Sequence, residues 1–354
     1  MGYFLTLLLC FLASVTITPL VKKLAFIVGA TDRPNQRKVH QKIMPRLGGL
    51  AIYIAFMVGV LVLDPDNAVE MHILLGSAII IITGMLDDLI ELSPKVKLAG
   101  QLLAAFVVVV FGGIQVEYIN LPFGSQLHFG VFSIPLTILW IVGITNAINL
   151  IDGLDGLAAG VSAIALITIS WMAFLKGDLF VAGMSIILIG SILGFLVYNF
   201  HPAKIFMGDT GALFLGYMIS VLSLLGFKNV TAISFIIPVI ILGVPISDTF
   251  FAIIRRLVKR QPLSAPDKSH LHHCLLRLGY SHRQTVLIIY GVSALFGLIA
   301  VILSKAAAWV SLIILTVVVL ALEVMAEKIG LVGHNYRPIL RIVQGIRYVN
   351  GKMK

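Results

Sequence analysis

Long apolar runs separated by short polar segments dominate the pattern of this 354-residue chain. Most of these runs approach the roughly 20 residues that a helix needs to cross the core of a bilayer. The pattern therefore predicts an all-α polytopic membrane protein with about eleven transmembrane helices. The expected spans are 3–21, 47–63, 71–86, 98–113, 131–148, 157–175, 179–198, 210–227, 231–254, 285–303 and 306–325.

The polar segment 112–130 differs from the other connections. It carries β-branched and aromatic residues on both sides of a Pro-Phe-Gly turn at 122–124, which is typical of a hairpin. We expect a small β-hairpin near 112–130, with a plain connector between two helices as the alternative.

The basic residues sort to alternate loops. If the N-terminus lies outside, all 26 Lys and Arg residues except Lys176, Lys228 and Lys305 fall in inside segments. Membrane proteins concentrate Lys and Arg in their cytoplasmic loops, so this split predicts an outside N-terminus and a cytoplasmic C-terminus. We expect one transmembrane domain over 1–327, followed by a basic cytoplasmic tail over 328–354.

Composition narrows the function classes. The chain is 59% hydrophobic and 12% charged, about half the charge of a typical soluble domain. The formal net charge of +10 follows from the membrane topology and its attraction to anionic lipid, so nucleic acid is not an expected partner. The two cysteines, Cys10 and Cys274, indicate neither a disulfide framework nor a CxxC metal site.

Acidic residues gather at the predicted inner ends of the helices. Asp87 and Asp88 close the third span, and adjacent carboxylates both stay ionised only beside a cation. Mg²⁺ bound to phosphate oxygens would supply that charge. The alternative is a helix end whose two acids are simply solvated.

A second polar run lies at Thr145–Gly160. Asn146, Asn149, Asp152 and Asp155 are spaced by three, which would align them on one face of a helix. Such a face suits a sugar, a base edge or a metal ion, and Gly153 and Gly156 would allow a close approach. An Asx-rich turn is the alternative.

Two further segments carry candidate chemistry. In Tyr198–Gly216, Pro202 breaks a helix, Asp209 is the expected N-cap of the next helix and a magnesium ligand, and Phe206 could stack on a base. In Ala265–Ser281, three histidines lie within four residues. Zinc lacks a convincing fourth ligand there, so hydrogen bonding to phosphate oxygens is the better interpretation. The three histidines are His270, His272 and His273.

Basic residues of the first and second inside loops are candidate anion clamps. Arg46 ends the first loop, while Lys95 and Lys97 follow the Asp pair within two or three turns. Positive-inside bias alone would produce part of this charge. Their placement nevertheless suits a phosphate beside the acidic pair.

Taken together, these segments resemble the polyprenyl-phosphate N-acetylhexosamine-1-phosphate transferases, from about Asp32 to Ser281. The Asp pair, the Asn-x-x-Asp-Gly-x-Asp-Gly run, and the Asn and Asp of the third segment occur in family order. The resemblance implies catalytic roles for Asp87, Asp88 and Asp155, and magnesium binding by Asp209 with Asp87 and Asp88. The substrate-binding residues that it implies are Asn149, Asp152, Asn199, Phe206, Lys95, Lys97, Arg46, His270, His272 and His273.

Two departures favour one branch of the family. His270-Leu271-His272-His273 stands where the MraY-type enzymes have three consecutive histidines, and Glu91 stands where they have lysine. These features resemble the WecA-type enzymes, and especially the enzyme that starts wall teichoic acid linkage units. They favour UDP-GlcNAc over UDP-MurNAc-pentapeptide as donor.

The resemblance implies transfer of N-acetylglucosamine-1-phosphate to undecaprenyl phosphate, with release of UMP and with Mg²⁺ (or Mn²⁺) as cofactor. The expected location is a bacterial plasma membrane, with the active site on the cytoplasmic face. The expected partners are a UDP-N-acetylhexosamine, undecaprenyl phosphate and membrane lipid, and a homodimer stays an open alternative to a monomer. Direct attack by the lipid phosphate and a covalent aspartyl-phosphate are both compatible with the sequence.

Two other classes of membrane protein share part of this pattern. CDP-alcohol phosphotransferases share the spacing of Asp152, Asp155, Gly156 and Ala159, but Gly160 stands where they have Arg and no further Asp pair follows, so we reject them. An ion-coupled transporter is the non-enzymatic alternative. Asp248, inside the ninth predicted helix and without a catalytic role, is the residue that would suit it.

Overall fold

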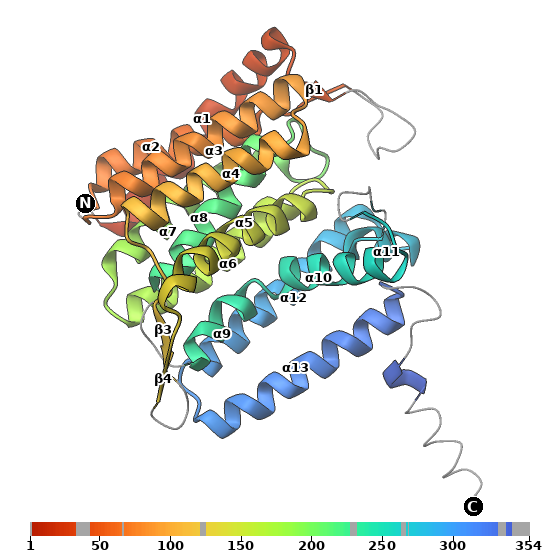
Figure 1. Cartoon of the computed structure of the whole chain (residues 1–354). Coiled ribbons are helices and arrows are strands. Elements are labelled where there is room, and N and C mark those ends of the chain that lie inside the picture. Colours follow the sequence, from red (N-terminus) through yellow and green to blue (C-terminus); the bar gives the residue numbers. More distant parts are fainter. Residues whose placement is uncertain are drawn as a thin grey trace, which may run out of the picture.

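The computed structural model describes residues 2–32, 43–65, 67–120, 125–226, 232–262, 267, 269–331 and 338–341. Helices dominate this part of the chain (Figure 1). They are α1 Tyr3–Val28, α2 Gly48–Leu63, α3 Glu70–Ile90, α4 Pro94–Phe106, α5 Ser133–Ile151, α6 Leu157–Leu175, α7 Leu179–Asn199, α8 Gly208–Gly226, α9 Ala232–Ile241, α10 Gly243–Val258, α11 Leu271–Arg277, α12 His282–Leu303 and α13 Ala308–Ile329. A π-helical turn at Val107–Phe111 continues α4, and a 3-10 turn at Gly130–Phe132 precedes α5.

Each of the eleven predicted spans overlaps a helix. Nine helical segments of the described residues are long and apolar enough to cross a membrane, and α2 is apolar but shorter. The all-α polytopic architecture predicted from the sequence is therefore confirmed. Helix ends differ by several residues, as at α1, which continues to Val28 and stops where Gly29 adopts φ 79°.

The ninth predicted span is not one helix. The stretch 231–254 is divided at Leu242 into α9 and α10. Pro245 explains the division, because its ring has no N–H to donate and fits only the first turn of a helix. A helix must therefore restart at Gly243, and α10 is an amphipathic segment that ends in Arg255 and Arg256.

Helix α8 lies at the centre of the bundle and packs against α2, α3, α5 and α6. Its side chains are buried along nearly its whole length. The α2 backbone approaches α8 so closely that a Cβ at Gly49 would overlap the backbone of Gly211. This close approach fixes the start of α8 beside the start of α2, and these two helix ends form one wall of the site described below.

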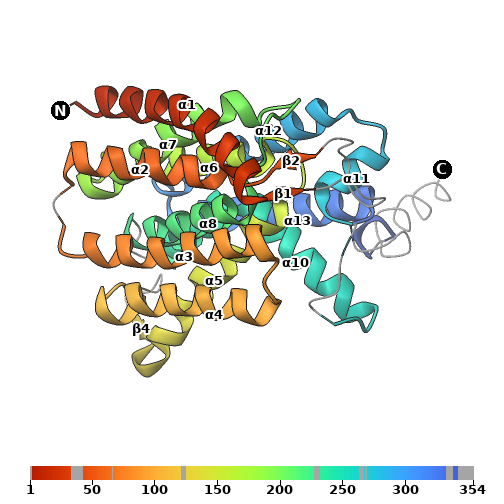
Figure 2. The same cartoon turned by 90° about the horizontal axis from the view of Figure 1, so that it is seen from above.

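Short strands mark the two ends of the bundle. Strands β1 (Thr31–Asp32) and β2 (Met44–Pro45) pair antiparallel, as do β3 (Tyr118–Asn120) and β4 (Gln126–His128). The second pair confirms the hairpin predicted near 112–130. Figures 1 and 2 place β1, β2 and α11 at one end, and the N-terminus with the β3–β4 hairpin toward the other.

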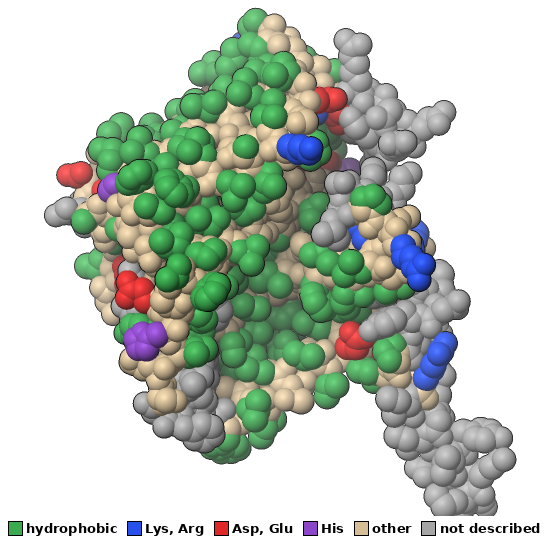
Figure 3. Space-filling view, viewed as in Figure 1, with side chains coloured by type: hydrophobic (Ala, Val, Ile, Leu, Met, Phe, Trp, Pro, Cys, Tyr) green, Lys and Arg blue, Asp and Glu red, His purple; other side chains and the backbone are tan. Residues whose placement is uncertain are grey.

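The surface agrees with a membrane environment. Large apolar side chains such as Leu61, Phe132 and Leu312 are exposed on the helices. Figure 3 shows hydrophobic side chains over most of the helical surface, while the Lys and Arg visible on this face lie mainly near the end that carries α11. Loops predicted to be cytoplasmic thus share one end of the bundle, whereas the orientation itself stays a prediction.

Candidate active site

A cavity of about 800 Å³ opens at the end of the bundle that carries β1 and α11. Its wall combines the first inside loop, the ends of α3 and α5, the α5–α6 and α7–α8 connections and the start of α12. These segments are far apart in the sequence, and they are the ones that carry the predicted motifs. The predicted site residues that line it are Arg46, Asp88, Asn149, Asp152, Asp155, Asn199, Phe206, Asp209 and His273.

Asp209 is the centre of a charged cluster. Its Oδ1 accepts a hydrogen bond of 2.7 Å from the amide of Asn149, and its Oδ2 pairs with the ammonium of Lys97. Lys97 also forms an ion pair with Asp87 Oδ2 at 3.0 Å. The lysine thus lies between two carboxylates contributed by α3 and α8, and a cation is electrostatically favoured at that point.

Asp88 has a different environment from Asp87. Its side chain is 3% exposed, and its carboxylate accepts the backbone N–H groups of Asp209 and Thr210 and the Thr210 hydroxyl at 2.6–3.0 Å. Asp88 therefore caps the N-terminus of α8 from a neighbouring helix, where a negative charge stabilises the helix dipole. This geometry favours a positioning role for Asp88, and metal binding by it stays a prediction.

The expected N-cap at Asp209 is wrong, because α8 begins one residue earlier, at Gly208. Gly208 adopts φ 70°, and a Cβ there would meet the Asp88 carboxylate at 2.5 Å. The side chain of Asp209 therefore does not cap its own helix; it lines the cavity and pairs with Asn149 and Lys97.

The first inside loop contributes Arg46. Its guanidinium donates to the backbone carbonyl oxygens of Asp88 (3.0 Å) and Asp87 (3.4 Å), at the C-terminal end of α3. A cation there complements the negative end of the helix dipole. Lys95 and Lys97 both belong to the start of α4 and neither lines the cavity, but Lys95 is exposed, whereas Lys97 is half-buried and pairs with two carboxylates.

The Asn-x-x-Asp-Gly-x-Asp-Gly run is only partly helical. Helix α5 ends at Ile151, and Asp152 and Asp155 lie in the connection to α6, where Gly156 adopts φ 75°. The expected helical alignment therefore extends no further than Asn149. Because the chain turns at this point, the two acids line the cavity from a loop.

Asp152 is held in an unfavourable electrostatic environment. Burial raises its pKa to about 8, and the nearby carboxylates of Asp209, Asp88 and Asp155 add to the shift. The ionised form is therefore costly in the folded protein, as is common for acids at functional sites.

Asp152→Asn should consequently stabilise the fold in magnesium-free buffer. A raised folded-state pKa means that the wild-type protein loses stability as the pH rises from about 4 to about 8, whereas the variant does not. We expect a gain of about 1 kcal/mol at pH 8, or about 2–4 °C in Tm, after allowance for solvent screening. Thermal unfolding in detergent at pH 5 and pH 8 measures it, and an equal gain at both pH values would contradict this account.

Asn199 and Phe206 belong to the α7–α8 connection. Asn199 is buried, and its amide accepts from Gly156 N–H (3.1 Å) and donates to the Ile205 carbonyl (3.0 Å). It therefore ties the α5–α6 loop to this connection. The backbone of Phe206 pairs with Pro45 and Gly48, which anchors this residue beside the first inside loop, and Phe206 lines the cavity.

The three predicted histidines have three different environments. His270 is buried and lies outside the described lining, with its Nδ1 2.8 Å from Asp248 Oδ2. His272 packs against Gly153, where a Cβ would overlap its Nε2. Burial, with His273 adding to it, lowers the pKa of His272 to about 3, so this ring is neutral. His273, whose pKa burial also lowers, faces the cavity.

Asp248 accepts hydrogen bonds from two residues at the start of α11. Its Oδ1 accepts the backbone N–H of Leu271 at 2.7 Å, while its Oδ2 accepts from His270. A carboxylate can only accept, so His270 must donate through Nδ1. Asp248 is therefore a positioning residue that fixes α11 and the orientation of the His270 ring, and it no longer suggests a transport pathway.

We expect Asp248→Asn to lower kcat about tenfold or more, because the amide still caps Leu271 but loses a charge-assisted hydrogen bond worth about 1.5–3 kcal/mol. The KM for the donor should change much less than kcat, which a general loss of structure would not produce. Asp178→Asn is the matched control, since Asp178 caps α7 at the opposite end of the bundle. Equal kinetics in both variants would contradict the assignment.

Sequence reasoning missed two residues that line the cavity, His201 and His282. His201 precedes Pro202 in the α7–α8 connection, and His282 is the first residue of α12. His201 lies within the segment Tyr198–Gly216, and His282 directly follows the segment Ala265–Ser281. Each is a histidine at the predicted inner end of a helix, and a histidine in that place indicates a site only when the fold brings several such helix ends together.

Comparison with known proteins identifies the family. The model described as Glycosyl transferase family 4 matches residues 71–227. A probable undecaprenyl-phosphate N-acetylglucosaminyl 1-phosphate transferase of Bacillus subtilis (strain 168) is 51% identical over 92% of this chain and 91% of its own length. The chain belongs to the polyprenyl-phosphate N-acetylhexosamine-1-phosphate transferase family. The resemblance found in the motifs is confirmed.

Two further relatives show the breadth of this transferase family. A decaprenyl-phosphate N-acetylglucosaminephosphotransferase of Mycolicibacterium smegmatis is 37% identical over 76% of this chain and 74% of its own length. A phospho-N-acetylmuramoyl-pentapeptide-transferase of Halalkalibacterium halodurans is 34% identical over 84% of this chain and 96% of its own length. The family consists of phosphoglycosyl transferases, so the chain is an enzyme of that class and a multi-pass membrane protein.

A divalent metal ion, on which this family generally depends, fits the cluster around Asp209. Hard cations such as Mg²⁺ prefer one or two carboxylates together with phosphate oxygens. The Lys97 ammonium between Asp87 and Asp209 shows that the carboxylates already attract a positive charge. Asp209, which lines the cavity, and Asp87 stay the predicted ligands of this ion.

Proposed function

We propose that this enzyme transfers N-acetylglucosamine-1-phosphate from UDP-GlcNAc to undecaprenyl phosphate and releases UMP. Family membership supports the reaction class, and the names of the Bacillus and Mycolicibacterium relatives favour GlcNAc and a polyprenyl phosphate. The observation that carries the proposal is the Asp209–Lys97–Asp87 cluster, because its member Asp209 lines a cavity of about 800 Å³.

In this reaction an oxygen of the lipid phosphate attacks the β-phosphorus of UDP-GlcNAc, and the bond from that phosphorus to the bridging oxygen breaks. The leaving UMP carries the electron pair. Phosphoryl transfer depends mainly on positioning and on neutralising charge. When bound, Mg²⁺ would neutralise charge on the diphosphate oxygens.

The chain's own residues hold and neutralise the reacting groups. Lys97 and Arg46 supply positive charge at the inner ends of α3 and α4, and Asn149 orients Asp209. Phe206 offers a ring at the cavity wall for the base, and His273 a neutral hydrogen-bonding group. Asp87 accepts a hydrogen bond from Leu92 N–H and pairs with Lys97, and these contacts are compatible with direct attack by the lipid phosphate and with a covalent aspartyl-phosphate.

The site faces the cytoplasm of a bacterial cell in this proposal, because the basic loops and the cavity share one end of the bundle and Lys and Arg favour the cytoplasmic side. The resemblance to the enzyme that starts wall teichoic acid linkage units extends the proposal to that pathway. Depletion of the protein in its own cell should then reduce teichoic acid while lipid-linked MurNAc-pentapeptide is retained.

The direct test uses purified protein, undecaprenyl phosphate and three radiolabelled donors: UDP-GlcNAc, UDP-GalNAc and UDP-MurNAc-pentapeptide. The expected result is a butanol-extractable lipid from UDP-GlcNAc alone, dependent on Mg²⁺ or Mn²⁺ and matched by release of UMP. Product from UDP-MurNAc-pentapeptide instead would overturn the donor. Absence of labelled lipid with all three, in protein that remains monodisperse, would overturn the reaction.

A further inference from the structure

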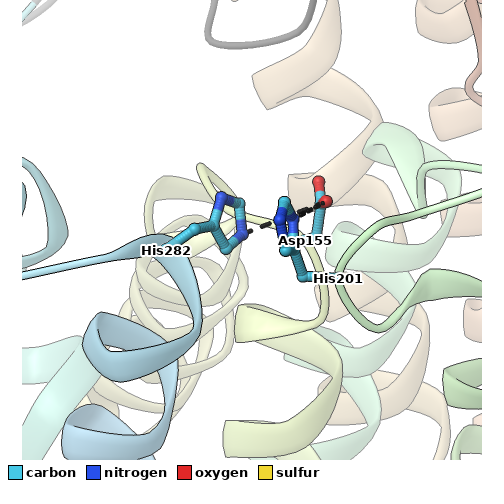
Figure 4. Close-up of side chains that lie close together, drawn as sticks. All are labelled: Asp155, His201 and His282. Carbon is cyan, nitrogen blue, oxygen red and sulfur yellow. Dashed lines mark hydrogen bonds and ion pairs between the residues drawn. The ribbon is translucent and has the colours of Figure 1, made fainter.

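Asp155, His201 and His282 converge at the cavity wall from three separate segments (Figure 4). His201 Nδ1 lies 2.7 Å from Asp155 Oδ2, and His282 Nε2 lies 4.0 Å from the same oxygen. One ligand atom of each residue lies within 4.8 Å of the others. The two imidazole rings stack with their centroids 4.1 Å apart.

One ring nitrogen of His282, Nε2, is buried without a hydrogen-bond partner of ordinary geometry among the described residues. The His282 ring interacts with the backbone of Asp155, and its Nε2 points toward Asp155 (Figure 4). A buried polar atom without a partner is costly, and it calls for a ligand or ion. The backbone around it is fixed, because Ser281 and Gln284 form a capping box at the start of α12.

Neighbouring contacts fix the Asp155 side chain and the His201 backbone. Ala203 N–H donates to Asp155 Oδ2 at 3.1 Å, and Arg283 donates to the His201 carbonyl at 3.2 Å. Arg283 is exposed and places a positive charge beside the three side chains. Its charge is opposed by the carboxylates of Asp155 and Asp152 in the same cavity wall.

We propose that Asp155, His201 and His282 form a zinc site, distinct from the magnesium site at Asp209. Two imidazoles and one carboxylate, with an open fourth position, suit Zn²⁺ and similar transition metals far better than Mg²⁺. Zinc bonds of about 2.0–2.2 Å place tetrahedral ligand atoms about 3.3–3.5 Å apart. The separations of 2.7 and 4.0 Å bracket that distance, so small side-chain rotations complete the site.

Occupation of the site has a functional consequence that rests on the proposed function. Asp155 lines the cavity in which the nucleotide-sugar would bind. An ion that engages Asp155 and both rings would narrow the mouth of this cavity and withdraw the carboxylate from the donor. Zinc should therefore inhibit transfer competitively with UDP-GlcNAc.

Zinc binding is measured without substrate, so it is independent of the proposed function. Protein freed of its purification tag and treated with EDTA is titrated with ZnCl₂ in excess MgCl₂, and bound zinc is counted by mass spectrometry. We expect one zinc ion per chain, with His201→Gln and His282→Gln each weakening binding about tenfold or more. His128→Gln, on the exposed β3–β4 hairpin, is the matched control and should bind as wild type.

Three outcomes would overturn the site: no stoichiometric zinc, unchanged binding in both variants, or a loss of binding in His273→Gln instead. Zinc-edge X-ray absorption of the wild-type protein covers the case in which the variants fail to fold. Two imidazoles and only nitrogen or oxygen ligands are expected, and a sulfur ligand or a single imidazole would refute the assignment. Binding without competition against UDP-GlcNAc would leave the zinc site and remove only the proposed inhibition.

Discussion

Asp209→Asn should abolish measurable transfer, with a loss of at least about 10²–10³ in kcat. The substitution removes the charge that pairs with Lys97 and that would hold the divalent ion, while the amide retains a similar volume. The KM for Mg²⁺ should rise in whatever activity persists. The measurement is labelled GlcNAc incorporated into butanol-extractable lipid over a magnesium titration.

Asp64→Asn is the matched control for this variant. Asp64 is exposed at the C-terminal end of α2, where it adopts φ 49°, a conformation that Asn tolerates well. It should leave transfer unchanged. Full turnover of Asp209→Asn would remove the metal site from the proposal.

Asp87→Asn separates the remaining mechanistic roles. If it retains full turnover while Asp209→Asn is inactive, Asp87 is not the nucleophile of a covalent aspartyl-phosphate route. Trapping of a phosphorylated wild-type enzyme by rapid acid quench, lost in Asp87→Asn, would instead favour the covalent route.

Lys97→Gln should cause the second large effect, about 10²–10³ in rate. Its ammonium pairs with both Asp87 and Asp209, so the substitution leaves two partly buried carboxylates without their shared cation. Lys95→Gln changes the same residue type two positions away, at an exposed site. We expect it to cost less than about tenfold, in line with the small energies of exposed charges.

The rates of Lys97→Gln and Lys95→Gln, compared with each other, test whether the contacts of Lys97 matter for transfer. Rates measured with saturating UDP-GlcNAc and saturating lipid, for protein of equal monodispersity, give the ratio directly. Equal losses in the two variants would show that the Asp87–Lys97–Asp209 contacts do not govern the reaction.

Chain pattern alone determined the membrane architecture. The length and spacing of apolar runs reflect a local requirement, because each spanning segment must satisfy its own backbone hydrogen bonds within the bilayer. The hairpin near 112–130 also followed from local residues. The break at Leu242 lay within reach of the same reasoning, since Pro245 stands inside the ninth predicted span.

Sequence motifs also indicated which segments carry the chemistry. Asp87, Asp155 and Asp209 were identified because ionisable groups at membrane depth are costly without a function, and Asn149 and the histidine run because of their spacing. Their family order then indicated the transferase class, which the relatives confirm. The donor and the individual roles stay predictions.

Only the tertiary structure decided which partners each of these side chains contacts. Asp87 and Asp88 are neighbours in sequence, but the rotation of about 100° between consecutive helical residues directs one to Lys97 and the other to the N-terminus of α8. Likewise, Asp248 acquires its role from His270, and Asp155 its neighbours His201 and His282, through contacts between distant helix ends. Such contacts depend on how the helices pack, and helix packing is a property of the whole bundle that no local pattern encodes.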